Sequence, residues 1–432
     1  MRPSFSLFAI TFILITPASA QWKDRISLGQ GGESKIATDD HGNVYATCHQ
    51  PCKFYVSHDW GASFGEPKLL ENAMCDVDVY AWPDGRVNVV NIKNGVSGMQ
   101  PWYSTDFGKT LNAGKGIDGP LDREWLAVNP LNGEVFFNYS HGYIGGPKST
   151  GIFLAASTDG GKTFEPRGGR VDREKEGSYP VDPYLSNSSD GKIYAMWANS
   201  ADFNTIDNFR FAVSNDGGKT FEFHQTIAEF NKKWGDTQER WMLGCMVATG
   251  KNTVVVFYPD YEEMSVDGKT SRPMLVHYKV SKDGGKTFGE VRTVLPKSEI
   301  ESAIRSVEAS RKTDSGTAIY IETMPWACAD PSGRLYLAFQ DNRSGQTQAA
   351  DAVLNRWHVR FASCSDLVKG FVESERVSDD VACKRPPLDF LSCAADSKRA
   401  YVIWTETPNN KSDWAFSGDL YVARKILPAP AK

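Results

Sequence analysis

An eight-residue pattern recurs five times along the chain and constrains its fold more than any other feature. Ser281-Lys-Asp-Gly-Gly-Lys-Thr-Phe288 has close copies at 214–221 and 157–164 and looser copies at 104–111 and 57–64. The pattern is Ser-x-Asp-x-Gly-x-x-aromatic, with Leu111 in place of the aromatic residue in one copy. Each residue type suits a tight turn, because Ser and Asp oxygens accept from backbone N–H groups and Gly adopts positive φ. The chain is therefore predicted to be a series of similar β units.

A second sequence pattern precedes these turns and indicates the number of units. It consists of an apolar strand, a turn of Gly, Asp or Asn, and a second β-rich strand. It occurs seven times, at 36–45, 79–90, 125–137, 183–194, 244–256, 327–336 and 392–401. Four strands per repeat are typical of a propeller blade. We predict an all-β fold, a seven-bladed propeller with four-stranded antiparallel blades. A strand around Arg25–Leu28 is expected to close the ring and cover its edge.

The turn pattern resembles the Asp-box (BNR repeat) of sialidase-like β-propellers, from about residue 30 to the end of the chain. The resemblance implies the architecture, whereas hydrolases, lyases and binding proteins all carry the box. Fold and activity are therefore separate questions.

The N-terminal segment predicts export. Met1-Arg-Pro3, an apolar run over 5–15 and Ala18-Ser-Ala20 together match a signal peptide, residues 1–20, cleaved before Gln21. The rest, 21–432, is expected to be one secreted, extracellular domain and a monomer. No later run is long enough for a membrane span. A net charge of −5 offers no basic surface for nucleic acid.

Cysteines and sequons fit the same compartment. The eight cysteines suggest disulfides. Cys245, Cys328 and Cys393 fall at one register of successive repeats. They can be interpreted either as core thiols or as disulfide-bonded cysteines. Sequons that permit glycosylation occur at Asn138, Asn187, Asn342 and Asn410.

One segment departs from the strand pattern. Ile300, Ile304 and Val307 are spaced for one face of a helix among charged residues. We predict an amphipathic helical insertion at 297–311, between the fifth and sixth repeats, as a rim element or a plain elaboration.

The loops that enter the first strand of each repeat or leave the second are expected to meet on one face, around the central channel. They carry charged and aromatic side chains, which suit an acidic sugar. The predicted catalytic residues are His49, His141, Arg240, Arg343 and Tyr258. The predicted substrate-binding residues are Arg123, Trp125, Glu239, Trp241 and Glu322.

Seven blades in a secreted chain resemble the propellers that act on rhamnosyl-glucuronate caps of arabinogalactan. The resemblance implies a lyase that removes the proton next to the uronate carboxylate by β-elimination. Arg240 and Arg343 would hold that carboxylate, with Arg123 in reserve. His141 and His49 would transfer protons, helped by Tyr258.

Alternative functions remain open at this stage. A rhamnosidase or sialidase-like hydrolase needs two carboxyl groups, for which Asp122, Glu239 and Glu322 are candidates. Sialidases carry an Arg-Ile-Pro motif, and here Arg25-Ile-Ser27 lacks the Pro. A glycan-binding propeller without catalysis is the third class. No cofactor or metal is required, although Asp76, Asp78, Asp182 and Asp389 make Ca²⁺ a candidate ion.

Overall fold

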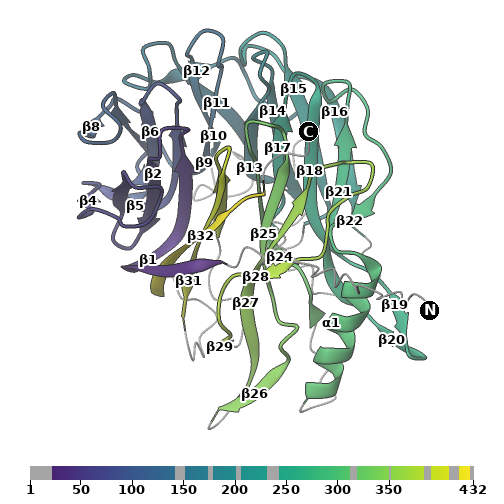
Figure 1. Cartoon of the computed structure of the whole chain (residues 1–432). Coiled ribbons are helices and arrows are strands. Elements are labelled where there is room, and N and C mark those ends of the chain that lie inside the picture. The colour runs from purple at the N-terminus through teal and green to yellow at the C-terminus, as the bar shows by residue number, and fades with distance from the viewer. Residues whose placement is uncertain are drawn as a thin grey trace, which may run out of the picture.

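The computed structural model describes residues 22–141, 151–173, 179–200, 206–230, 243–311, 319–349, 352–383, 391–407 and 418–428, and every structural statement below refers to these residues. They form antiparallel sheets in a β-propeller arrangement (Figure 1). The prediction of an all-β propeller is therefore confirmed.

Five sheets are separate blades. The first comprises β5 (Ala73–Ala81), β6 (Val87–Lys93), β7 (Met99–Ser104) and β8 (Asn112–Ala113), with a short 3₁₀ helix, η1 (Asn94–Val96), between β6 and β7. The next comprises β9 (Leu121–Val128), β10 (Val135–His141), β11 (Gly151–Ser157) and β12 (Glu165–Arg167). It is followed by β13 (Tyr179–Asn187), β14 (Ile193–Ser200), β15 (Asn208–Ser214) and β16 (Glu222–Glu229).

The last two separate blades carry additions. One comprises β17 (Cys245–Thr249), β18 (Thr253–Tyr261), β21 (Pro273–Ser281) and β22 (Arg292–Thr293), with β23 (Ile319–Tyr320) added in parallel to β21. A hairpin of β19 (Met264–Val266) and β20 (Lys269–Ser271) projects from it. The other comprises β24 (Thr323–Ala329), β25 (Leu335–Asp341), β26 (Gln346–Ala349), β27 (Ala352–Cys364), β28 (Glu375–Arg376) and β29 (Val381–Cys383).

The remaining strands form one seven-stranded sheet. Its strands are β30 (Ser392–Ala395), β31 (Arg399–Glu406), β32 (Gly418–Ile426), β1 (Lys23–Thr38), β2 (Val44–His49), β3 (Lys53–Ser57) and β4 (Lys68–Leu69), in that order. The expected count of seven separate blades is therefore wrong, because the structure has five. The physical reason is β1, which pairs with β32 over Lys23–Gly31 and with β2 over Gly32–Thr38 and so joins strands from both ends of the chain.

Strand sequences explain why the sheets pack face to face. All seven residues of β25 are buried, as are the first six of β6. Strands buried on both faces read as nearly continuous apolar runs instead of alternating ones. The core therefore lies between neighbouring sheets.

The five repeated turns have the hydrogen bonds that their residue types predict. The Ser281 hydroxyl accepts from Gly285 N at 2.8 Å, and Asp283 Oδ1 accepts from Lys286 N and Thr287 N, both at 3.0 Å. The equivalent Ser and Asp oxygens accept in the other four copies. Hydrogen bonds from the Thr287 hydroxyl and backbone lower the pKa of Asp283 to about 2. The turns are thus fixed by local chemistry.

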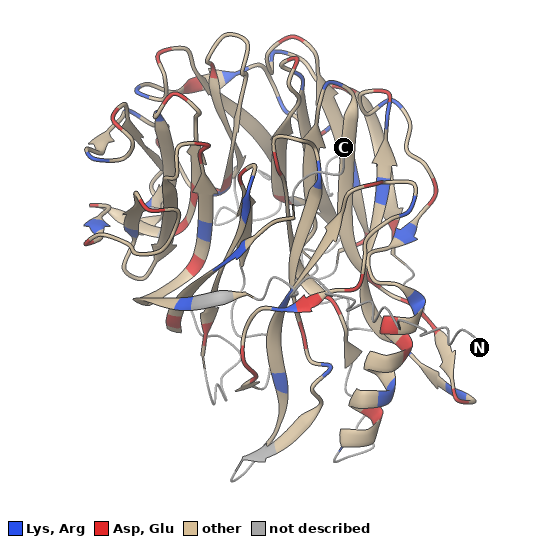
Figure 2. Ribbon diagram, viewed as in Figure 1, with Lys and Arg blue, Asp and Glu red and all other residues tan. Residues whose placement is uncertain are grey.

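The helix α1 (Lys297–Ser310) occupies the segment predicted to be helical. It buries Ile300, Ala303, Ile304 and Val307 in the core cluster of its neighbouring blade. In Figure 1, α1, the β19–β20 hairpin and β26 all extend from the lower side of the molecule, away from the loops at the top. Insertions therefore gather on one side. Acidic and basic residues are interspersed along α1 and the strands in this view (Figure 2). The described residues contain no helix long and apolar enough to cross a membrane.

Candidate functional site

Four innermost strands share an unusual backbone feature. Glu33, Asp76, Arg123 and Asp182 have φ values of 42°, 34°, 61° and 46°. Each lies where the register between the first and second strands of its repeat is interrupted by a bulge. Left-handed backbone in a residue other than Gly costs about 1–3 kcal/mol and is concentrated at functional sites. We call these four residues the bulge ring.

The bulge ring occupies one register of the repeats. Two residues further on, at the same register, lie Lys35, Asp78, Trp125 and Tyr184, and Trp326 follows the left-handed Met324 in the same way. We call these five residues the channel layer. Because side chains alternate along a strand and bulges re-aim them, the two sets form successive layers of one site.

Arg123 lies between two carboxylates of the bulge ring. Its Nε is 3.1 Å from Asp182 Oδ1, and its Nη1 is 3.8 Å from Asp76 Oδ2. The Arg123 side chain is 18% exposed, whereas those of Asp76 and Asp182 are 6% and 9% exposed. The guanidinium is thus the part of this cluster that solvent reaches most easily.

Glu33 and His49 form the second half of the cluster. His49 Nδ1 lies 2.5 Å from Glu33 Oε2, and Asp76 N donates to the same oxygen at 3.3 Å. Burial and the charge of Asp76 raise the pKa of Glu33 to about 8. Although burial opposes its ionisation, Arg123 holds the pKa of Asp76 below its ordinary value. Two neighbouring carboxyl groups therefore have pKa values pushed apart, as in many acid–base sites.

Asp122, just before Arg123, is a third carboxyl group within electrostatic reach. Burial raises its pKa to about 7; Asp76 and Asp182 contribute to this rise and Arg123 opposes it. Asp122 is only partly buried, so its proton is available near neutral pH. Burial also raises the pKa of Asp182.

The channel layer closes the space beneath the cluster. Lys35 Nζ lies 3.9 Å from the centre of the Trp125 ring and 3.2 Å from that of Trp326. Trp125 stacks on Tyr184 with ring centres 5.8 Å apart. Asp78 Oδ2 accepts from Leu126 N at 2.7 Å. Burial lowers the pKa of the Lys35 amine to about 7. This buried amine between aromatic rings forms a floor to the site.

Glu124 is buried directly behind the bulge ring. It is fully buried, and neither of its carboxylate oxygens has a hydrogen-bond partner among the described residues. Burial and the charge of Asp76 raise its pKa well above the ordinary value. Glu124 therefore ionises less readily than an ordinary glutamate.

The structure brings together two of the sequence-predicted residues, His49 and Arg123, through Asp76. His49 is fully buried, so it acts on a ligand only through Glu33. Trp125 is 3% exposed and its ring is covered by Lys35, Tyr184 and Trp326, which leaves no face for a sugar. The bulge at Arg123 thus places Trp125, a predicted substrate-binding residue, in the channel layer among these side chains.

Arg343 and Glu322 lie in a second charged network, at α1. Arg343 pairs with Asp341 and, at 2.5 Å, with Glu299 of α1. Glu322 is fully buried, and its Oε2 accepts from Val276 N at 3.0 Å. These contacts tie the insertion to its neighbouring blades. Neither residue presents a free polar atom to solvent.

Tyr258 lines a groove between β16 and β21. The groove has a volume of about 400 Å³ and is also lined by Glu229, Asp260, His277 and Lys279. Tyr258 stacks on His277 with ring centres 5.8 Å apart, and burial raises the pKa of its hydroxyl. None of the bulge ring residues lines this groove, so the structure separates Tyr258 from Arg123.

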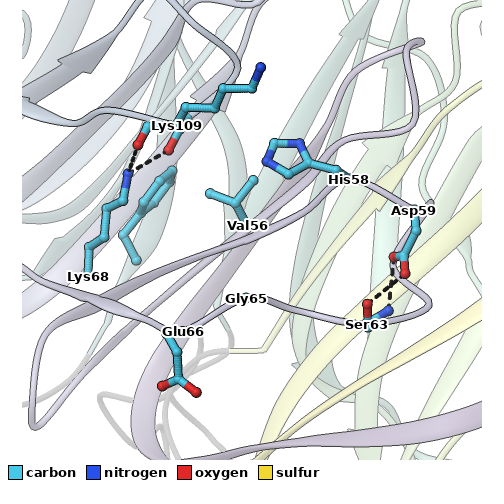
Figure 3. A pocket seen from close by; sticks show the side chains of 10 residues that line it. Val56, His58, Asp59, Ser63, Gly65, Glu66, Lys68 and Lys109 are labelled. Carbon is cyan, nitrogen blue, oxygen red and sulfur yellow. Dashed lines mark hydrogen bonds between the residues drawn. The ribbon is translucent and has the colours of Figure 1, made fainter.

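Another pocket, of about 380 Å³, lies at the turn of residues 57–64 (Figure 3). His58 and Lys109 are among its lining residues, and Lys68 Nζ donates to Gly108 O at 2.8 Å. None of the predicted site residues lines it. We therefore place the candidate site at the bulge ring and not in this pocket.

The remaining predictions fall outside the description. His141 ends β10, and its side chain is not described. Glu239, Arg240 and Trp241 lie outside the described residues, as does Asp389. In the described ranges, no three His, Cys, Asp or Glu side chains are grouped to hold a metal ion. The seven described cysteines are free thiols in this structure.

Three residues of the site, Glu33, Asp76 and Asp182, were not among the predicted catalytic or substrate-binding residues, although Asp76 and Asp182 were candidate Ca²⁺ ligands. Aligning the repeats on their first strands places all three, with Arg123, in one column two residues before the channel layer. In the described repeats with this bulge, that column holds these three acids, Arg123 and Met324 at the start of apolar strands. This periodic charge is the signal in the sequence that points to them.

No protein-family model matches the chain, and no curated protein matches it in sequence. Solved structures of similar arrangement include an α-L-arabinofuranosidase from Fusarium graminearum, with 11% identity, coverage of 94% of this chain and 98% of that one, and a TM-score of 0.47. A protein of unknown function from Dyadobacter fermentans has 13% identity, coverage of 93% and 99%, and a TM-score of 0.46. A PL25 ulvan lyase has 10% identity, coverage of 76% and 77%, and a TM-score of 0.42. Identities and scores this low assign neither a family nor an activity.

Proposed function

We propose that this chain is a carbohydrate-active enzyme that hydrolyses a glycosidic bond at the bulge ring. One observation carries the proposal: four strained backbone positions on neighbouring strands hold an arginine and three carboxyl groups, with Asp122 beside them. Strain of this kind persists where the surrounding structure enforces a particular arrangement. Carboxyl groups with separated pKa values are what glycoside hydrolysis requires.

The roles follow from protonation. Asp122, with a pKa of about 7, donates its proton to the glycosidic oxygen as the bond to the anomeric carbon breaks. Asp76 remains ionised beside Arg123 and accepts a proton from the water that adds to that carbon. Arg123 orients the sugar through hydrogen bonds while neutralising the carboxylates around it.

β-Elimination on a uronate, as in a rhamnosyl-glucuronate lyase, is the second candidate. Its support is Arg123, since a guanidinium is the natural partner of a uronate carboxylate. Arg123 already pairs with Asp182 and lies near Asp76, so an anionic substrate would have to displace or protonate a carboxylate. This cost favours hydrolysis of a substrate that carries no charge at the cleaved unit.

The test is incubation of the purified protein with gum arabic, a sialoside and a panel of neutral aryl glycosides. New reducing sugar without ultraviolet absorbance from an unsaturated uronate, lost in Asp122→Asn, supports hydrolysis. Formation of an unsaturated uronate would instead support the lyase. Glycan binding without any product would support the third class, a glycan-binding propeller without catalysis.

We also propose that β1 closes the ring by joining strands from both ends of the chain. Support comes from β1 changing partner between Gly31 and Gly32. Export after removal of residues 1–20, and a monomeric state, complete the proposal. N-terminal sequencing of secreted protein and its mass in solution test these two points.

A further inference from the structure

Three buried or partly buried thiols meet where three innermost strands lie side by side. Cys245 is on β17, Cys328 on β24 and Cys393 on β30, and these strands pack in that order. Cys393 Sγ lies 3.3 Å from Cys328 Sγ. Cys245 is within electrostatic reach of both.

β24 and β30 belong to different sheets, so no backbone ladder joins them. Apolar side chains line this seam, among them Ala338, Val359 and Val402, and the Cys393 thiol donates across it to Trp326 O at 3.2 Å. A covalent bond across it would fasten the seven-stranded sheet to its neighbour. The two sulfur atoms need to approach by only about 1.3 Å to reach the disulfide length of about 2.0 Å.

We propose that Cys328 and Cys393 form a disulfide that fastens β24 to β30. The oxidant is a small-molecule or protein disulfide, such as oxidised glutathione. One cysteine thiolate attacks that disulfide and releases one thiol, and the second cysteine thiolate then attacks the mixed disulfide and releases the other. The two cysteines lose two electrons and two protons, and the oxidant becomes two thiols.

Burial determines when the bond forms. It raises the pKa of the Cys328 thiol well above its ordinary value, and the neighbouring Cys393 adds to the rise. A protonated thiol is a poor nucleophile. The bond therefore forms while the chain is folding, before β24 and β30 close over the sulfur atoms, and is slow to form or break afterwards.

Cys245 is the natural control because it lies beside the pair without being part of it. Its thiol is buried as deeply as that of Cys393. Cys245→Ala should leave the bond intact, whereas Cys328→Ala and Cys393→Ala should each abolish it. This comparison separates the chosen pair from the other pairings within the three thiols.

The experiment uses full-length protein secreted into an oxidising compartment and purified without reductant. Free thiols are alkylated in denaturant, and the protein is digested and mapped by mass spectrometry. We expect one peptide pair linked through Cys328 and Cys393, present in wild type and in Cys245→Ala. Alkylation of both residues in wild type, or a link from either one to Cys245, would overturn the proposal.

Thermal unfolding gives a readout that does not depend on the variants alone. The closed loop spans residues 328–393, so wild type that has been reduced in denaturant and refolded should have a Tm about 5 °C below that of the oxidised protein. The Cys328→Ala/Cys393→Ala variant should show no such dependence on reductant. An identical Tm for oxidised and reduced wild type would contradict a bond at this seam.

Discussion

The guanidinium of Arg123 is held by Asp182, which belongs to the next blade, with Nε and Oδ1 3.1 Å apart. Each of these residues has left-handed backbone, so each strand gives up regular pairing to present its side chain. The contact therefore joins two strained positions that neither blade would adopt alone. It also places a positive charge among the carboxyl groups of the bulge ring.

Replacing Arg123 by Met should leave the buried carboxylates of Asp76 and Asp182 without their cationic partner. Breaking a buried ion pair by removing one partner costs about 3–5 kcal/mol, so the free energy of unfolding should fall by about that amount. Urea unfolding measures it. Arg86→Met, which removes an exposed pair with Asp84, should change stability by less than about 1 kcal/mol. Equal losses in the two variants would argue against a special role for Arg123.

Asp122→Asn should abolish most of the proposed hydrolysis while preserving the fold. Loss of a general acid lowers kcat by about 10²–10⁴-fold, and the amide of Asn cannot act as an acid near neutral pH. The activity assay should be paired with circular dichroism. Asp84→Asn, at an exposed carboxylate bonded to Arg86, is the matched control and should be fully active. Full activity in Asp122→Asn would remove this residue from the mechanism.

The pH profile should follow the proton on Asp122. The acid is active when protonated, so kcat/KM should be constant below its pKa of about 7 and fall about tenfold per pH unit above it. Asp76 must be ionised, and since Arg123 lowers its pKa the acidic limb should lie below the usual range for Asp. Rates on a soluble glycoside across pH would test both limbs. A profile rising through pH 8 would reverse the assigned roles.

Two adjacent glycines of one turn should differ in what they tolerate. A Cβ on Gly161 would lie 2.0 Å from Asn88 Nδ2, while one on Gly160 would meet nothing within 4 Å. Asn88 cannot move aside because it accepts from Trp82 Nε1 at 2.8 Å and donates to Gly160 O at 3.0 Å. Both positions have positive φ, so Gly160→Ala should cost about 1 kcal/mol, and Gly161→Ala at least about 2 kcal/mol more. Denaturant unfolding would show the difference, and similar values for the two variants would contradict the close contact.

Two glutamates of α1 offer a similar comparison. Glu299 is nearly buried, pairs with Arg343 and accepts from Ser374 N at 2.9 Å. Glu301 is more exposed and makes only the long helical pairs with Lys297 and Arg305, at 3.8 and 3.6 Å. Glu299→Ala should therefore destabilise by about 3 kcal/mol and Glu301→Ala by about 0.5 kcal/mol or less. A larger loss for Glu301 would show that α1 is anchored differently.

Local features of the fold were predictable because their causes lie within a few residues. The turn at Ser281–Phe288 is specified by its own hydroxyl, carboxylate and glycines, and α1 by the spacing of Ile300 and Val307. The blade count was not predictable in this way, because β1 changes partner at Gly31 and pairs with β32 at the other end of the described chain. Long-range pairing of this kind leaves no local mark.

The candidate site shows the same limit more sharply. Trp125 is of the residue type that stacks on sugars. However, a one-residue bulge at Arg123 determines which side chains of the strand lie in which layer. His49 was found from its place at the end of a hairpin, but its burial against Glu33 depends on the neighbouring strand. Asp76 and Asp182 were predicted only as Ca²⁺ candidates, and their common register with Glu33 and Arg123 becomes visible only when the repeats are superposed.

The double pairing of β1 has a consequence for biosynthesis. Gly32–Thr38 can find β2 as soon as the first hairpin emerges, whereas Lys23–Gly31 must wait for β32. Until then the first strand carries an exposed edge of unsatisfied amides through the synthesis of every other blade. During synthesis that edge is open to pairing with a second copy of the chain.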